Sequence, residues 1–330
     1  MPEICFIMKY IRLRSTDPYY NLALEEYLLT KRDEDFFLLW QNRPVVVIGK
    51  NQNAYAEVNL AYAKEHGIDV CRRITGGGAV YHDLGNVNYS FITSAQKAEM
   101  LDYAYFTRPI IDALAEMGLE CSLSGRNDLV CGDQKFSGNA QYSTNGRILH
   151  HGTLLLQTDT NVLSSVLKVD KEKMQFKAVK SHKSRVVNLN TLLKKPLAVE
   201  EFIGSIEAYV LRSLKAERVE ESGIAGHPNI EALRARNASD EWIYSDKRYL
   251  TNYTVYKKKK FPFGVVCAEM TLLGDVIESI RLSGDFFGIS PLDELEASLV
   301  GSSIRSLPKL DISKYVSGMT LADLQELLNS

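Results

Sequence analysis

Two stretches of this sequence concentrate side chains that can hold an anion and act on it. The first reads RRITGGGAVYHDLGN, from Arg72 to Asn86. Because glycine has no Cβ and reaches positive φ, three consecutive glycines let the backbone approach a ligand closely and offer it N–H groups. The two preceding arginines can hold the charge of the anion. A tight hairpin with solvated arginines would use the same residues, so a second element is needed to indicate a site.

The second stretch reads SGRNDLVCGDQKFSGNAQYSTNGRILHHGTLLL, from Ser124 to Leu156. Its pattern predicts strands over Asp128–Cys131, Lys135–Tyr142 and Ile148–Leu156, with the hairpin dipeptide Asn145-Gly146 before the third. Three meandering strands favour a mixed or antiparallel sheet and an α+β fold. The absence of GxGxxG and GxxxxGK[ST] motifs agrees with that class.

If both stretches face one pocket, its arginines, lysine and backbone amides suit a polyanion together with a carboxylate. Activation of a carboxylic acid by ATP fits this set, because attack on the α-phosphate gives an acyl-adenylate and pyrophosphate, and positioning with charge neutralisation supplies most of the catalysis. Lys135 is the natural bridge between the two anions, since its ammonium is a compact charge on a flexible stem. Ser137 and Gly138 beside it favour close approach of a ligand to the backbone. A solvated strand lysine is the alternative.

Magnesium is expected with ATP, held largely by phosphates and by about one carboxylate. Asp128 is the candidate carboxylate, or it organises the turn into its strand. His150 and His151 point to opposite faces of a strand, so at most one reaches a pocket, and a hydrogen-bonding role for His151 is favoured over metal ligation. Buried small hydrophobes are the default interpretation of the three nearby cysteines, Cys71, Cys121 and Cys131.

The composition narrows the class of protein. The 330 residues are 24% charged and 45% hydrophobic, as in ordinary globular domains. The net charge of −2 provides no basic field for nucleic acid. Five cysteines at irregular spacing fit reduced thiols better than a disulfide framework. No apolar run is long enough for a signal peptide or a membrane span, so we expect a cytoplasmic monomer without membrane partners.

The remaining pattern predicts the elements that position these stretches. Asp17-Pro18 begins a helix that packs one face and shows Glu25 and Glu26 on another side. Phe36–Trp40 and Val45–Ile48 are interpreted as a hairpin. Further helices are predicted over Val58–His66, Leu101–Met117 and Glu200–Leu214.

Beyond residue 245 the pattern predicts a small α+β unit. Strands are expected over Tyr253–Lys257, Val265–Thr271 and Val276–Leu282, followed by helices that begin at Ser290-Pro291 and at Thr320. About eighty residues suffice for a separate domain. We therefore predict a catalytic domain over residues 1–246 and a small accessory domain over residues 247–330.

Four segments together resemble the lipoate–protein ligase family. They are DPYYNLALEEYLL (Asp17–Leu29), RRITGGGAVYHDLGNVNYSF (Arg72–Phe91), GRNDLVCGDQKFSGNAQY (Gly125–Tyr142) and HHGTLLL (His150–Leu156), with KSHKSRVVNL (Lys180–Leu189) as a weaker fifth. The combination of RxxGGGxVxHDxGN, GRND…KxSG and HHGTL is specific at family level. The tail resembles the family's C-terminal domain at GDFFG (Gly284–Gly288). Trp242–Tyr244 resembles its linker, although the usual Gly and Pro are missing after it.

This resemblance implies a biotin/lipoate-ligase fold, related to class II aminoacyl-tRNA synthetases, with a small α+β C-terminal domain. It implies that ATP and lipoate give lipoyl-adenylate, and that the ε-amine of a lysine on a lipoyl domain then takes the acyl group as an amide. The acceptors would be acyltransferase subunits of 2-oxoacid dehydrogenases or the glycine-cleavage H protein.

By motif match, the resemblance also assigns site residues. Lys135 would contact both the acyl carboxyl group and the α-phosphate, and Leu167–Arg185 would form the adenylate-binding loop. The nucleotide would be held by Arg73, Gly78, Ala79, Val80 and Tyr81. The lipoyl group would be bordered by Arg72, Thr75, Gly76, Gly77, His82 and His151.

Two other functions stay open at this point. An octanoyl- or lipoyl-transferase of the same fold needs no ATP and works through a cysteine thioester. Cys121 and Cys131 are near the lysine strand, but Arg126-Asn127-Asp128 occupies the place where those relatives carry their cysteine. A non-catalytic lipoyl-domain binder is opposed by the intact Lys135 and glycine loop. The sequence leaves open the choice between lipoate and octanoate, the preferred acceptor, and whether a partner protein is needed for transfer.

Overall fold

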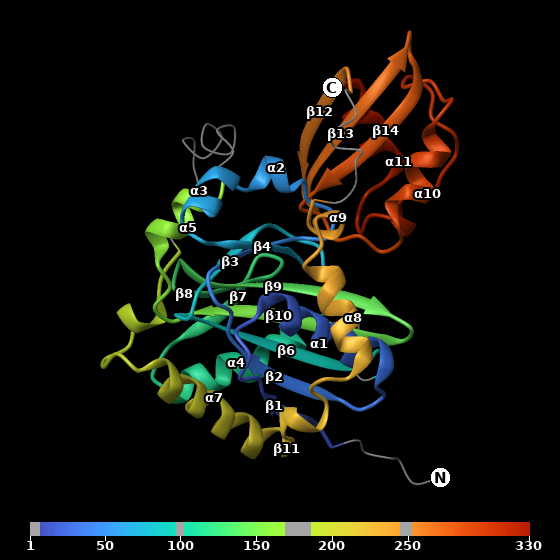
Figure 1. Ribbon diagram of the computed structural model, residues 1–330. Coiled ribbons are helices and arrows are strands. Elements are labelled where there is room, and N and C mark those ends of the chain that lie inside the picture. The colour runs from blue at the N-terminus through green and yellow to red at the C-terminus, as the bar shows by residue number, and fades with distance from the viewer. Residues whose placement is uncertain (1–6, 97–101, 169–185, 245–252) are drawn as a thin grey trace. The chain divides into compact units, whose positions relative to one another are not determined.

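The computed structural model describes residues 7–96, 102–168, 186–244 and 253–330 (Figure 1). The chain divides into two compact units. The first unit consists of Met1–Val46, Asn59–Cys71 and Tyr81–Ala238, and the second of Val47–Val58, Arg72–Val80 and Ser239–Ser330. Two short segments from the N-terminal third of the chain thus belong with its C-terminal part. The domain boundary predicted between residues 246 and 247 falls outside the described residues and stays a prediction.

The first unit is built on an eight-stranded sheet with the strand order β11-β1-β2-β6-β10-β9-β8-β7. Strand β1 runs parallel to β11 and β2, whereas the remaining pairs are antiparallel. The strands are β1 Lys9–Arg12, β2 Phe36–Trp40, β6 Asn86–Ser94, β7 Cys121–Ser124, β8 Asp128–Cys131, β9 Gln134–Thr144, β10 Arg147–Leu155 and β11 Glu217–Arg218. The predicted meander is confirmed at β8, β9 and β10, and the sheet is mixed, as expected.

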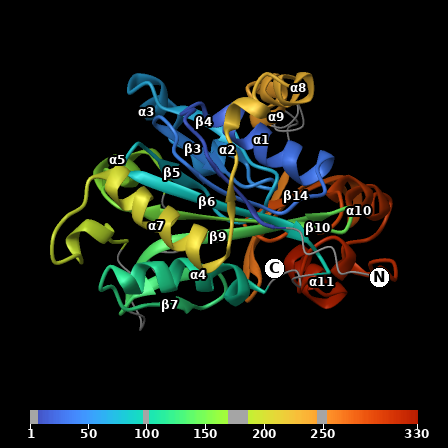
Figure 2. The same cartoon turned by 90° about the horizontal axis from the view of Figure 1, so that it is seen from below.

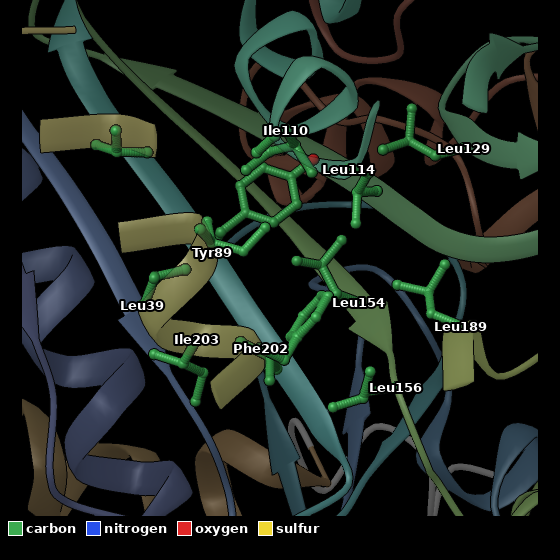
Figure 3. Close-up of a cluster of buried hydrophobic side chains, with 14 of the residues drawn as sticks. Leu39, Tyr89, Ile110, Leu114, Leu129, Leu154, Leu156, Leu189, Phe202 and Ile203 are labelled. Atoms are coloured by element: carbon green, nitrogen blue, oxygen red, sulfur yellow. The ribbon is translucent and has the colours of Figure 1, made fainter. Parts of the chain in front are cut away.

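Helices cover both faces of this sheet (Figure 2). Helices α1 (Pro18–Lys31) and α8 (Pro228–Asn237) lie on one side, and α4 (Tyr103–Glu116) and α7 (Val199–Ser213) on the other. Apolar side chains of α4, α7 and the strands form a contiguous core, part of which Figure 3 shows. Complete burial of each large side chain stabilises the fold by roughly 1.5–3 kcal/mol. The labelled core residues are Leu39, Tyr89, Ile110, Leu114, Leu129, Leu154, Leu156, Leu189, Phe202 and Ile203.

Helix α1 begins where the sequence predicts, because the Asp17 side chain caps its first turn and Pro18 takes the first helical position. The prediction that this helix packs one face and shows Glu25 and Glu26 on another side is wrong. Glu25 is only 1% exposed, and Glu26 is half-buried in an ion pair with Arg236 of α8. The helix packs against β6 and β10 on one side and against α8 on another. The apolar stripe of the sequence predicts only one buried side, so it does not reveal the second.

The hairpin predicted from Phe36–Trp40 and Val45–Ile48 is also wrong. The first run is β2, which pairs with β1 and β6, whereas the second is β3, in a three-stranded sheet with the order β4-β3-β5. The turn between them is held by α1, because the buried Asn21 Nδ2 donates to Asn42 Oδ1 over 3.0 Å. The chain is therefore directed away from β2. The other strands of this sheet are β4 Asp69–Arg72 and β5 Val80–His82.

The C-terminal part of the second unit is an antiparallel sheet with the order β12-β13-β14 and two longer helices. Helix α11 begins with a capping box between Thr320 and Asp323. The strands and helix starts predicted here are confirmed. The elements are β12 Val255–Phe261, β13 Gly264–Leu273, β14 Val276–Gly284, α10 Leu292–Leu299 and α11 Leu321–Asn329.

Shorter helices complete the described chain. They are α2 Ala54–Glu57, α3 Leu60–Glu65, α5 Thr160–Val166 and α9 Asp240–Ile243. Among the helices that the structure describes, none has the length and apolar character needed to cross a membrane.

Candidate active site

The predicted site residues divide between the two units, so each set is described by itself. The second unit holds the glycine loop, residues 72–80, and the first unit holds Tyr81, His82, Asp128, Lys135 and His151. The predicted adenylate-binding loop, Leu167–Arg185, lies outside the described residues from position 169 onward.

Two glycines of the loop are required by its packing within the second unit. Gly77 has a φ of 90°, in the left-handed region. A Cβ on Gly76 would lie 2.5 Å from the carbonyl oxygen of Phe286, a backbone atom that cannot rotate away. Phe286 belongs to the GDFFG segment that the sequence singled out. The glycine loop and this segment are thus packed backbone against backbone.

Arg73 determines the shape of the glycine loop from inside. Its buried guanidinium donates to the Gly76 and Gly78 carbonyls over 2.7 and 2.8 Å, and to Thr75 Oγ1 over 2.8 Å. In a trans peptide the C=O and the following N–H point in opposite directions. The N–H groups that follow Gly76 and Gly78 therefore point away from Arg73. This orientation suits an anion that approaches the loop from the far side of Arg73.

Arg72 is surrounded by backbone carbonyls. A guanidinium has five N–H donors in a fixed plane, and here it donates to several main-chain oxygens. Trp242 also donates a hydrogen bond to Arg72, from its indole Nε1 to the Arg72 carbonyl over 2.9 Å. The lipoate-binding role predicted for Arg72 stays a prediction, and these contacts give it a second role, which is to hold the loop and the linker together. The acceptors are the carbonyls of Gly49, Lys50, Gln52, Trp242 and Ile243.

Lys135 lies on β9 next to a β-bulge. The pairing of β8 with β9 shifts between Leu129 and Val130, so that Lys135 opposes Val130 and one extra residue, Phe136, is inserted on β9. Phe136 enters the core. As a consequence the Lys135 side chain folds over Gly138, where a Cβ would lie 3.4 Å from Nζ. The lysine thus lies against the backbone at Gly138, and the close approach of a ligand predicted from KFSG stays a prediction.

The ammonium of Lys135 is paired with Asp128. Nζ lies 2.6 Å from Oδ1, and the two side chains are 31% and 33% exposed. Asp128 comes from β8, directly opposite Gly138. The bulged pair of strands therefore places one cation and one carboxylate together at a solvent-accessible position of the first unit.

His151 is paired with a carboxylate that the sequence did not single out. Its Nδ1 lies 3.1 Å from Glu25 Oε1, and the Ser90 hydroxyl also donates to this oxygen. Ser90 in turn accepts a bond of 2.8 Å from the indole of Trp40. The signal that could have found Glu25 is its place in the middle of an apolar helix, four residues after Asn21, which is also buried. A carboxylate there must be paired.

His82 joins the same group of side chains. Its ring lies edge-on to Trp40 with centroids 6.2 Å apart, and its Nδ1 is 3.1 Å from Asn42 Nδ2. The structure therefore connects the two predicted histidines, His82 and His151, through Trp40 and the buried Glu25.

The alternation predicted along β10 is confirmed. His150 stacks on Phe106 of α4, with ring centroids 4.8 Å apart, whereas His151 contacts Glu25 of α1 on the opposite face of the sheet. Burial holds the pKa of His150 well below its usual range. His150 is thus a neutral core residue.

The segment after the glycines passes from exposed to buried. Gly78 is exposed, Ala79 and Val80 are half-buried, and Tyr81 is buried. Burial raises the pKa of Tyr81 to about 12, so its hydroxyl is protonated at neutral pH. Across the described ranges, no group of three or more His, Cys, Asp or Glu side chains is arranged to hold a metal ion.

Two family matches cover most of the chain. Residues 17–211 match the lipoyl protein ligase A/B catalytic domain, and residues 251–328 match the bacterial lipoate protein ligase C-terminus. The chain belongs to the lipoate–protein ligase family. The family and the α+β fold implied by the sequence motifs are thereby confirmed.

Relatives within the family are similar over nearly their whole length. The lipoate–protein ligase LplJ of Bacillus subtilis is 36% identical over 94% of this chain and 97% of its own. Lipoate–protein ligase 1 of Staphylococcus aureus is 40% identical over 89% of this chain and 90% of its own. Both are ligases of the same enzyme class, so the chain is similar to ligases in both of its parts.

Solved structures of ligases share the fold. LipL1 of P. falciparum, in complex with lipoate, covers 98% of both chains with a TM-score of 0.76 at 24% identity, and so shows the fold alone. A structure from Thermoplasma acidophilum, described as a bi-partite lipoate protein ligase and its E2 lipoyl domain, covers 72% of this chain and 96% of its own with a TM-score of 0.62 at 27% identity. Lipoate-protein ligase A bound with ATP covers 72% and 98% with a TM-score of 0.59 at 25% identity.

Proposed function

We propose that this protein uses ATP to convert lipoate to lipoyl-adenylate and then transfers the lipoyl group to a lysine of a lipoyl domain. The observation that carries the proposal is the bulged hairpin of β8 and β9, which folds Lys135 over Gly138 and beside Asp128. Family membership supports ligase chemistry, and the relative bound with ATP supports the nucleotide.

Lys135 would bridge the carboxylate of lipoate and the α-phosphate of ATP. In the reaction a lipoate oxygen bonds to the α-phosphorus, the bond from that phosphorus to the bridging oxygen breaks, and pyrophosphate leaves. A cation at the meeting point reduces the repulsion of the two anions and stabilises the charge that develops in the transition state. Because exposed ion pairs are worth only about 0–1 kcal/mol, Lys135 can exchange Asp128 for these anions at little cost.

The glycine loop would contact the nucleotide. Arg73 turns the carbonyls of Gly76 and Gly78 toward itself, so the following N–H groups can donate to phosphate oxygens. Their donation needs no rearrangement, because the guanidinium already holds the loop. The proposed contacts are those of Arg73, Gly78, Ala79, Val80 and Tyr81.

The lipoyl group would lie near the histidines that Trp40 connects. The indole would contact the aliphatic chain, and Glu25 would fix the ring of His151. To the residues assigned by motif we therefore add Trp40 and Glu25. The motif-assigned residues are Arg72, Thr75, Gly76, Gly77, His82 and His151.

Magnesium would accompany ATP. Its preference for oxygen ligands and for few protein groups fits one carboxylate, and Asp128 is such a group on the same hairpin as Lys135. The residue that would hold the ion is Asp128, and the ion would neutralise phosphate charge when bound.

The acceptors are proposed to be lipoyl domains of 2-oxoacid dehydrogenase acyltransferase subunits and the glycine-cleavage H protein. A similar solved structure, described as a bi-partite lipoate protein ligase and its E2 lipoyl domain, supports this class of partner. We further propose a cytoplasmic monomer, with a catalytic domain to residue 246 and an accessory domain after it.

The decisive experiment omits any acceptor protein. Wild-type protein is mixed with lipoate, Mg²⁺ and radiolabelled ATP, and we expect pyrophosphate release and a protein-bound adenylate. Lys135→Ala is expected to lower the rate at least about 100-fold, because it removes a charge that stabilises the transition state. Lys9→Ala is the matched control, since Lys9 is an equally exposed lysine (31%) paired with Glu34 in the same unit, and it should retain the wild-type rate.

Three outcomes separate the parts of this proposal. Adenylate formation that is equal in Lys135→Ala would remove Lys135 from the chemistry while leaving the function in place. No adenylate from the wild type would exclude ATP-dependent activation. Octanoyl transfer between lipoyl domains that is abolished by Cys121→Ser or Cys131→Ser would establish the thioester transferase instead.

A further inference from the structure

Two cysteines of the first unit face each other across neighbouring strands. Cys121 begins β7 and Cys131 ends β8, and the register pairs them directly. Their Sγ atoms lie 2.6 Å apart. Both side chains are half-buried, at the edge of the apolar core.

The backbone at this pair suits a covalent bond between the two sulfurs. Residues directly opposite in antiparallel strands have Cα atoms about 4.5–5.5 Å apart. Disulfides span Cα separations of about 4.4–6.8 Å. The strands therefore already stand at the right separation, and oxidation of the pair requires little movement of the backbone.

The two thiols differ in acidity. A hydrogen bond from Cys121 lowers the pKa of Cys131, whereas the same pairing and burial raise the pKa of Cys121. Cys131 is accordingly the sulfur that reaches the thiolate first, and Cys121 is the one that follows.

We propose that Cys121 and Cys131 form a reversible oxidation site, at which hydrogen peroxide produces a disulfide between β7 and β8. The Cys131 thiolate attacks one oxygen of peroxide, which breaks the O–O bond and gives a sulfenic acid and, after protonation of the leaving hydroxide, water. Cys121 then attacks the sulfenic sulfur, the S–S bond forms, and the second water leaves. Two thiols are oxidised by two electrons in all and one peroxide is reduced to two waters. A thiol reductant reverses the reaction.

The bond would act on an edge of the large sheet. Strand β7 is the last strand in the sheet order, beyond β8, and Asp128 lies at the opposite end of β8 from Cys131. Because the sulfurs are already in contact, the pair of Asp128 with Lys135 is preserved. The disulfide therefore fastens the edge strand, and it protects both sulfurs from irreversible oxidation.

The test uses the full chain and hydrogen peroxide at low molar excess. After alkylation of remaining thiols, peptide mapping by mass spectrometry is expected to show one linkage, Cys121 to Cys131, with the loss of two hydrogens, and dithiothreitol is expected to remove it. The unfolding midpoint of the wild type should rise by roughly 5 °C on oxidation. Adenylate formation should stay within about twofold of the reduced protein.

Variants separate this site from general thiol oxidation. Cys121→Ser is expected to stop at a sulfenic acid on Cys131 that dimedone captures, and neither Cys121→Ser nor Cys131→Ser should show the rise in midpoint. Cys267→Ser is the matched control, because Cys267 is also half-buried but contacts the Tyr256 hydroxyl, and it should behave as wild type. Linkages to Cys71 or Cys267, disulfide-linked dimers, or two thiols that stay reduced under peroxide would each overturn the proposal. Wild-type mapping decides this even if a variant fails to fold.

Discussion

In the glycine loop the cations are held by the backbone, whereas in the hairpin of β8 and β9 the cation is held by a side chain. Arg72 and Arg73 are 2% and 6% exposed and donate to main-chain carbonyls. Lys135 is 31% exposed and pairs with the carboxylate of Asp128. The arginines therefore build the loop, and the lysine is the charge that we propose moves to the substrate. Residues with the same charge, both predicted to bind ligand, have different structural surroundings and should respond differently to substitution.

The largest expected effect is the loss of stability when Arg72 is replaced. Arg72→Ala leaves several buried carbonyls without their donor, which should lower the free energy of unfolding by roughly 3 kcal/mol. Urea denaturation followed by tryptophan fluorescence measures this, since Trp242 lies at the bond itself. Arg305→Ala is the control in the same unit, because Arg305 is 81% exposed and should change nothing. Unchanged unfolding together with weaker lipoate binding would instead place Arg72 on the ligand.

The second largest effect is a difference in stability between substitutions at two nearby glycines, Gly76 and Gly78. Gly76→Ala would press a methyl group against the Phe286 carbonyl, 2.5 Å away, and should cost about 2 kcal/mol of stability. Gly78→Ala has open space around its Cβ and should keep wild-type stability. If the loop approaches the nucleotide as proposed, Gly78→Ala weakens ATP binding, measured by calorimetry, although the protein is equally stable. Equal losses of stability in both variants would contradict the packing described for the loop.

The third effect is on the rate of adenylate formation, and it tests whether the reaction needs the compact, flexible ammonium of Lys135. Lys135→Arg keeps the positive charge but replaces a compact ammonium by a planar fork, so adenylate formation should fall about tenfold, or roughly 1.4 kcal/mol. The measurement is pyrophosphate release at saturating ATP and lipoate, with unfolding as the check on stability. A fully active Lys135→Arg would mean that charge alone is enough.

The smallest effect is expected at an ion pair of the first unit that has no role in the proposed site. Arg32 holds the pKa of Glu34 well below its usual range, with Lys9 contributing. A carboxyl with a lowered pKa stabilises the fold above its unfolded pKa of about 4.3, and this stabilisation is lost as the pH falls through the folded pKa. Glu34→Gln should therefore cost roughly 1 kcal/mol at pH 7, and the difference from wild type should shrink in acid-titrated unfolding. If the stability difference between Glu34→Gln and wild type persists at the lowest pH, it comes from packing and not from the charge of Glu34.

The features of the fold that could be predicted from the sequence are those set by residues adjacent in the chain. Asp17 and Pro18 predict the start of α1, the hairpin dipeptide Asn145-Gly146 predicts the turn between β9 and β10, and the tail strands follow from alternation. Within the site, the sequence also singled out Lys135 and the two histidines that Trp40 connects. The helix start and the turn depend on steric and hydrogen-bonding preferences of residues adjacent in the chain, so the sequence by itself determined them. The motifs also determined the family, whereas the roles of Lys135 and the two histidines stay predictions.

Other features depend on segments that meet only in the folded chain. Glu26 is half-buried because α8 covers one side of α1 and pairs it with Arg236, 210 positions away. Glu25 is buried on the side that faces the sheet, where Ser90 of β6 and His151 of β10 contact it. Arg72 finds its carbonyl acceptors at Trp242 and Ile243, 170 and 171 positions away. The bulge that turns Lys135 over Gly138 is a matter of register between two strands, which neither strand specifies alone. Burial, register and distant partners are properties of packing, and for that reason the tertiary structure decided them.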